Sequence, residues 1–290
     1  MAGEVYQCLV AGLPDLVFDQ GKLTLSWEGF REELENNLTP VDFRLAQLFF
    51  LPYDISNLLN ILNKSEEEDE GFVNRGNFSK EQLEEFADTK EIETPIDIAS
   101  NLNEFIEKLV IHFKNDIPLY NNMDWNNQFT NYYYAFCLAQ KNNFVRKWFE
   151  FEMNIKNIQV AINASNHEKE VEKELVGDNE VVDAILNERS KDFGLGNDYS
   201  YVEKILNLYE NKDLLTREKE VDLIKWNKVD ELNTFNYFSI EVLLGYLIKL
   251  NIVERWIKLD KETGKEMFER LMHDLQHDYE FPQEFKEYVQ

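Results

Sequence analysis

Two stretches of the sequence decide the fold: LFFLPYDISNLLNILN at residues 48–63 and WFEFEMNIKNIQVAIN at residues 148–163. Four residues recur unchanged at an offset of 100 positions, namely Phe49, Ile55, Asn57 and Asn63 as Phe149, Ile155, Asn157 and Asn163. Six more recur in kind: Leu45, Leu48, Leu51, Asp54, Leu58 and Leu62 as Val145, Trp148, Phe151, Asn154, Ile158 and Ile162. This recurrence indicates an internal duplication. Coincidence is the alternative, because two amphipathic helices placed in phase share apolar positions anyway, so the matched polar residues carry the argument.

The apolar residues of both stretches fall at spacings of three and four, which predicts two amphipathic helices. Asp54 with Asn57, and Asn154 with Asn157, lie three residues apart and therefore share a face beside the apolar stripe. Short amide and carboxylate side chains are unfavourable inside a helix unless they have a partner. We therefore expect them to form hydrogen bonds that fix a neighbouring helix or loop. The alternative is that Asp54 caps a new helix after a kink at Pro52.

Most of the remaining chain is predicted to be helical. Thr39-Pro40 and Thr94-Pro95 each place an N-cap hydroxyl before a proline, and Ser79 to Gln82 matches the capping box. Further helices are expected after Pro95, around 131–140, and over 144–163, 166–176, 199–210, 217–231, 239–258 and 260–278. The pattern of residues 5–25 fits either a short strand or the start of a helix. The acidic run 65–71 predicts a solvated linker, and an acidic docking strip is the alternative.

Composition narrows the classes of function. The chain has 290 residues, with 56 acidic against 30 basic side chains and a formal charge of −26. The negative electrostatic potential of such a chain disfavours binding to nucleic acid and flat adsorption on anionic lipid. No stretch approaches the roughly 20 apolar residues that span a bilayer, and no secretory signal is evident, so a cytosolic location is expected. Cys8 and Cys137 are expected to be small buried thiols without a disulfide.

A search for catalytic motifs identifies one candidate. His273 and His277 are four residues apart, so both imidazoles face one side of a predicted helix and are candidate metal ligands, although no third ligand is evident. The alternative is two polar residues on a surface. The segment GLGN at 194–197 lacks the lysine of a phosphate loop. The aromatic cluster Tyr132–Phe136 either lines a ligand groove or packs in the core.

The segment FVRKWFEFEMNIKNIQVAIN (144–163) resembles the repeated helix of the C-type subunit of V/A-type ATPases, the counterpart of the eukaryotic d-type subunit. In that family an apolar helix runs into an acidic or amide residue, then Asn, then further aliphatic residues. The opening VYQCLVAGLPDL (5–16) together with LFFLPYDISNLLNIL also resembles a bacterial family encoded beside V-type ATPase genes. One departure is that repeats of the C-type family often place a basic residue where this chain has Asn63 and Asn163.

The resemblance implies an all-α funnel of three helical modules, at residues 1–94, 95–196 and 197–290. It implies a non-catalytic protein, without a cofactor, that connects the central shaft of the ATPase to its membrane proteolipid ring. The location would be cytoplasmic, at the periphery of the inner membrane through the complex. The third module is represented by residues 250–271, with Trp256 and Asp260, in a loose register. Two rival functions are a metal-dependent hydrolase that uses His273 and His277, and a peptide-binding adaptor that uses Tyr132–Phe136.

Overall fold

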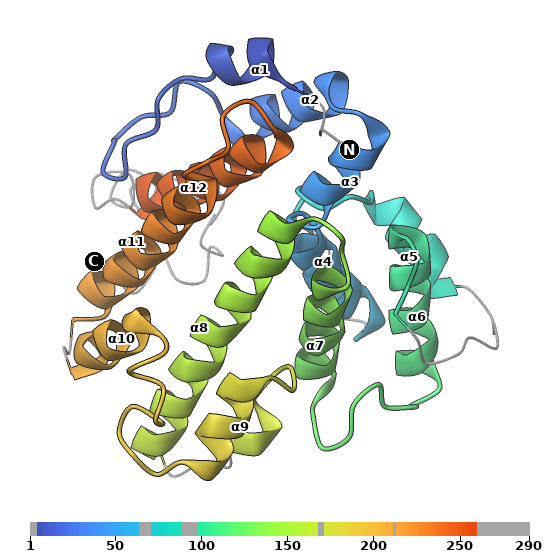
Figure 1. Cartoon of the computed structure of the whole chain (residues 1–290). Helices are drawn as coiled ribbons and strands as arrows, with labels where there is room; N and C mark the ends of the chain where they lie inside the picture. The colour runs from blue at the N-terminus through green and yellow to red at the C-terminus, as the bar shows by residue number, and fades with distance from the viewer. Residues whose placement is uncertain (1–4, 64–70, 89–97, 168–170, 211–212, 260–290) are drawn as a thin grey trace, which may run out of the picture.

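The structure of the chain, a computed structural model, describes residues 5–63, 71–88, 98–167, 171–210 and 213–259. Within these ranges the chain forms α-helices, one short 3-10 helix and no strand (Figure 1). The predicted all-α class is therefore confirmed. The segment 5–25 contains a helix rather than the optional strand, since the backbone N–H of Tyr6 donates to the carbonyl of Phe238 at 2.6 Å and the chain then turns into α1.

The helices are named here in chain order. They are α1 (Gln7–Gly12), α2 (Trp27–Asn37), α3 (Pro40–Gln47), α4 (Leu51–Leu62), α5 (Lys80–Asp88), α6 (Leu102–Lys114), α7 (Trp125–Leu138), α8 (Asn143–His167), the 3-10 turn Val171–Lys173, α9 (Glu180–Asn187), α10 (Ser200–Glu210), α11 (Leu214–Asn233) and α12 (Ile240–Leu259).

Two helix starts follow the predicted capping chemistry. Thr39 accepts a hydrogen bond from the backbone N–H of Asp42 at 3.2 Å, directly before α3. Ser79 and Gln82 form a reciprocal capping box before α5, with side chain to backbone distances of 3.3 Å and 2.9 Å. Local sequence therefore fixes these two boundaries.

Two other expected helices were placed wrongly. The helix expected after Pro95 starts only at Leu102, because Asn101 caps it by accepting from the N–H of Glu104 at 3.1 Å. Residues 89–97, which include Pro95 itself, lie outside the described ranges, as do residues 64–70 of the acidic run. The charged segment 166–176 is not one helix: α8 ends at His167 and a 3-10 turn follows. The helix α9, which lies beyond this turn, was not predicted.

The first repeated stretch is broken where one continuous apolar stripe was expected. The helix α3 ends at Gln47, a tight turn covers residues 48–50, and α4 starts at Leu51. The ring of Pro52 removes a backbone N–H and crowds the preceding turn, so a straight helix cannot pass through this position. The alternative, in which Asp54 caps a new helix after a kink at Pro52, was right that the stretch is broken. It was wrong about the cap, because Phe50 and not Asp54 occupies the N-cap position.

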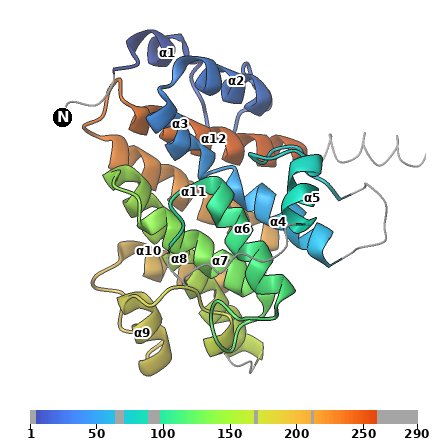
Figure 2. The same ribbon diagram turned by 90° about the vertical axis from the view of Figure 1, so that its right-hand side faces the viewer.

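The helices pack in a closed circuit. The helix α4 packs on α7, α7 on α8, α8 on α11 and α11 on α12, and α12 returns to α2 and α3. Figure 1 shows α8 as a long helix through the middle of the molecule, and both views place α1–α3 and α12 at one end and α9 at the other (Figure 2). The first and last described parts of the chain thus lie against each other, and helices from the whole chain surround the centre.

Candidate functional site

A cleft lies at the centre of this helix circuit. It has a volume of about 550 Å³ and is lined by α4, α7, α8, α11, α12 and the loop before α5. A second cavity of about 610 Å³ lies between α4, α7 and α8. The two cavities share Pro52, Tyr133 and Glu152 as lining residues, so they meet between α4 and α8. We call the two together the central cleft.

Aromatic rings from the two repeated stretches meet in the wall of this cleft. Phe49 and Phe149, which hold corresponding repeat positions, pack against each other with ring centroids 4.9 Å apart. Tyr133 of α7 packs edge-on against Phe149 at 5.6 Å and donates a hydrogen bond to the carbonyl of Leu48 at 3.2 Å. The repeated stretches therefore face each other at the centre, and the wall is rigid and apolar.

The predicted repeat residues Asn57 and Asn157 make the same contact on different helices. The Asn57 amide donates to the carbonyl of Val73 at 2.9 Å and accepts from its N–H at 2.9 Å. The Asn157 amide pairs in the same way with Val176, at 2.7 Å and 3.0 Å. Both amides are buried. The expectation that these side chains fix a neighbouring loop is confirmed for both.

Asp54 and Asn154 anchor the next part of each loop. The Asp54 carboxylate accepts from the N–H and the side chain of Asn77, at 2.9 Å and 2.8 Å, and from the N–H of Phe78 at 3.1 Å. Asn154 accepts from the side chain of Asn179 at 2.7 Å. We call residues 73–78 the first anchored loop and residues 176–179 the second anchored loop; each leads into a short helix, α5 or α9.

A glycine lets each loop approach its helix. A Cβ atom on Gly76 would lie 2.0 Å from Oδ1 of Asp54. A Cβ atom on Gly177, whose φ is +84°, would lie 2.7 Å from the sulfur of Met153. Both positions thus require glycine, the second also because its backbone lies in the left-handed region.

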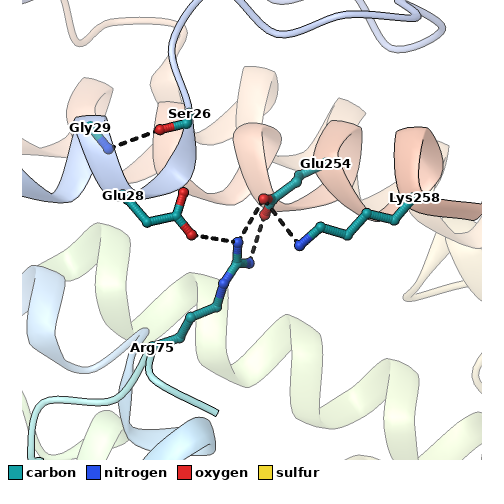
Figure 3. A network of polar contacts seen from close by, with 6 residues as sticks. All are labelled: Ser26, Glu28, Gly29, Arg75, Glu254 and Lys258. Carbon is teal, nitrogen blue, oxygen red and sulfur yellow. Dashed lines mark hydrogen bonds and ion pairs between the residues drawn. The ribbon is translucent and has the colours of Figure 1, made fainter. Parts of the chain in front are cut away.

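Arg75 projects from the first anchored loop and joins distant parts of the chain (Figure 3). Its guanidinium donates to both carboxylate oxygens of Glu254 on α12 at 2.6 Å, and to Glu28 on α2 at 3.0 Å. It also lies 4.7 Å from the ring centroid of Trp27, and Lys258 lies 3.2 Å from Glu254. Burial raises the pKa of Glu254, but the hydrogen bonds from Arg75 and Lys258 outweigh burial and lower it. Through this bidentate pair and the bond to Glu28, Arg75 ties the first anchored loop to both α12 and α2, which also pack directly on each other.

Two further carboxylates lie in the cleft. Burial raises the pKa of Asp222 on α11, although Lys225 and Arg255 lower it and the indole of Trp256 donates to it at 2.9 Å. Burial also raises the pKa of Glu152 on α8, where Lys225 lowers it and Asp222 raises it. The cleft therefore combines an aromatic wall with a compact group of charges.

The other candidate residues have different outcomes. His273 and His277 lie outside the described residues, and the described part of the chain contains no group of three or more His, Cys, Asp or Glu side chains arranged to hold a metal. Tyr132, Tyr133, Tyr134 and Phe136 are buried in the core, as the core interpretation predicted. Cys137 is buried as expected, whereas Cys8 is exposed because α1 lies on the surface.

Sequence reasoning missed Arg75, Glu254, Asp222 and Glu152. Nothing in the local pattern separates these residues from the other charged side chains of the chain. The only signal for Glu152 was its position: it corresponds to Pro52 at the offset of 100 residues, and both residues line both cavities.

Comparisons with other proteins give one match. The model of a family described as "Protein of unknown function (DUF2764)" matches residues 3–279. No curated protein and no solved structure matches the chain. Among the described helices, none has both the length and the apolar character that crossing a bilayer requires.

Proposed function

The chain belongs to the DUF2764 family, whose function is unknown, and we propose that it is a non-catalytic connecting subunit of a V/A-type ATPase rotor. In this role it joins the central shaft to the membrane proteolipid ring and transmits torque between them. It would lie at the cytoplasmic face of the inner membrane through its complex. The proposal starts from the resemblance of the repeated helix to that of the C-type family of these ATPases.

The observation that carries the proposal is the central cleft inside a closed helix circuit. Helices that are far apart in the described chain, from α4 to α12, line this cleft, so force applied inside it is passed to much of the described body. The two anchored loops and the Arg75–Glu254 pair favour a stiff body, because buried hydrogen bonds and a bidentate ion pair resist relative sliding of helices. A socket for the end of a shaft requires these properties and no active site.

A hydrolase that uses His273 and His277 finds no support in the described residues. Metal analysis of protein purified without a histidine tag is the discriminating measurement, because a stoichiometric bound ion has no place in the socket proposal. An adaptor that binds peptides through Tyr132–Phe136 is not favoured either, since these side chains pack in the core.

The test is co-purification with the other components of the rotary ATPase. We expect the chain to co-elute with the shaft or with the detergent-solubilised ring. Leu259 is exposed at the cleft, so Leu259→Asp should weaken binding of the shaft. Leu186 on α9 is similarly exposed and lines neither cavity, so Leu186→Asp is the matched control. Failure of the chain to associate with either the shaft or the ring would remove the proposal.

A further inference from the structure

Glu152 occupies an unusual position at the junction of the two cavities. Its side chain is 29% exposed, and it lines both parts of the central cleft. Among the described residues its charged contact is Lys225, at 3.9 Å from Oε1, which is too long for a hydrogen bond. No side chain or backbone N–H of the described residues donates to its carboxylate. A carboxylate in such a site is poorly compensated, because it has lost much of its water and gained no donor.

The neighbouring positive charges do not compensate the carboxylate of Glu152. Lys225 on α11 is shared between Glu152 and Asp222. Lys156 lies one helical turn after Glu152, yet its charge interacts with Glu174 and Asp124 instead. On α12, Arg255 pairs with Glu218 and Asp222, and Lys258 pairs with Glu254. The described side chains of α7 that line the cavities, including Tyr133 and Tyr134, carry no positive charge.

The second cavity is lined by Glu152, by Lys156 one helical turn further along α8, and by uncharged groups that favour a cation. Its wall contains the rings of Trp125, Tyr133 and Tyr134 and the amide side chains of Asn60, Asn63 and Asn126. Aromatic faces attract an ammonium or guanidinium group, and amide oxygens accept hydrogen bonds from it. At about 610 Å³ the cavity lies within the range of pockets that bury a small ligand or an inserted side chain.

We propose that Glu152 is the anchor for a lysine or arginine side chain carried by the end of the shaft that enters the central cleft. This inference rests on the proposed function and names the chemistry of the partner at that site. The free chain keeps a poorly compensated carboxylate in its centre, and the complex supplies the missing donors. Functional sites commonly hold such destabilising groups, because the group is satisfied only when the partner is bound.

The experiment compares two glutamates on the same helix, in the full chain, with the purified central shaft as the probe. Glu152→Gln removes the charge at the cleft and should weaken binding at least about 30-fold, as expected for loss of one member of a buried charge pair. Glu150 lies two residues away and is exposed, so Glu150→Gln should leave the dissociation constant unchanged. Isothermal titration calorimetry gives the dissociation constants of both variants and of the wild type.

A second measurement separates binding from folding. If Glu152 serves the partner, Glu152→Gln should leave the thermal midpoint of the free chain unchanged or raise it, because a poorly compensated carboxylate has been removed. Unchanged shaft affinity in Glu152→Gln would overturn the inference while the socket proposal stands. A lower midpoint together with weaker binding would also overturn it, since Glu152 would then be a structural residue. If the wild-type chain binds the ring but not the shaft, this inference fails while the proposed function stands. If it binds neither, both fail.

Discussion

The two anchored loops use the same attachment for different purposes. In both, a buried asparagine on the preceding helix holds the backbone of a valine, Val73 or Val176. Beyond this point they differ. The first anchored loop carries Arg75, which reaches α2 and α12, whereas the second anchored loop passes directly into α9. The shared amide therefore sets where each loop lies on its helix, and the residues that follow decide what the loop connects.

The helices that carry the loops differ in a related way. The position of Pro52 in α4 is held by Glu152 in α8, and these two residues lie at the same place, where the two cavities meet. Proline breaks the first stretch into α3 and α4, whereas glutamate allows α8 to continue for 25 residues. The first stretch thus turns a corner between α3 and α4, whereas the second lies within the long helix α8 and presents a charge to the cleft.

The comparison predicts that the first anchored loop strengthens the contact between α2 and α12, and Arg75→Ala tests this most strongly. The substitution leaves Glu254 in a largely buried site with Lys258 as its remaining partner. We expect the free energy of unfolding to fall by about 3 kcal/mol, the lower end of the range for breaking a buried ion pair. Denaturant unfolding measures it, and Arg146→Ala, at an exposed position on α8, is the control. A loss similar to that of the control would show that this contact does not depend on Arg75.

A further difference, a carboxylate at position 54 and an amide at position 154, predicts that only position 54 makes stability depend on pH. Burial raises the pKa of Asp54 from 3.8 to about 6, although hydrogen bonds from Asn77 and Phe78 lower it. The folded state therefore binds the proton more tightly than the unfolded state, so stability is greatest below the unfolded pKa and falls as pH rises through about 4 to 6. At 1.36 kcal/mol per pKa unit the loss is about 3 kcal/mol.

Exchanging the two side chains tests whether stability falls as the pH rises. Asp54→Asn should lose the fall in stability between pH 4 and 6, relative to the wild type. Asn154→Asp should gain such a fall, because Asn154 is equally buried and accepts a comparable hydrogen bond. Denaturant unfolding of both variants at several pH values gives the difference. Parallel pH profiles for the wild type and Asp54→Asn would contradict the assignment.

The shared amide predicts the smallest effects, and they should be unequal. Asn57→Leu and Asn157→Leu each leave a backbone N–H and a carbonyl without their partner, at a cost of about 1–3 kcal/mol. Val176 is fully buried whereas Val73 is 40% exposed, so water replaces the lost bonds more easily at the first anchored loop. We expect about 2–3 kcal/mol for Asn157→Leu and about 1 kcal/mol for Asn57→Leu in chemical denaturation. Asn60→Leu, at an exposed position of α4, should be neutral. A larger loss of stability for Asn57→Leu than for Asn157→Leu would contradict this prediction.

The sequence predicted those features that depend on short-range chemistry. The all-α class followed from apolar periodicity, and the capping residues Thr39 and Ser79 marked two helix starts correctly. Asn57 and Asn157 were identifiable because polar residues recurred where helices normally exclude them. The break at residues 48–50 was not the main interpretation, because the apolar spacing continues through these residues although the helix does not.

The cleft depended on contacts that no local pattern encodes. Arg75 and Glu254 are 179 residues apart, and Glu152 is distinguished only by what surrounds it after folding. In the segment 166–176, the local pattern predicted a helix that the structure does not contain as one element. Its charged sequence favours a helix, yet its described residues beyond α8 form only the 3-10 turn Val171–Lys173, and Asn157 pairs with the backbone of Val176 just after this turn. Tertiary hydrogen bonds therefore overruled helix propensity at this point.

The Arg75–Glu254 pair also bears on how the protein is made. At synthesis rates of about 5–20 residues per second, roughly 10 to 40 s pass between the appearance of the arginine and that of its partner. During this interval α2, α3 and the first anchored loop wait on the ribosome without the helix that covers them. The ring of Phe30, which packs on Tyr246 of α12 with centroids 4.7 Å apart, therefore lacks this partner until most of the chain has been synthesised.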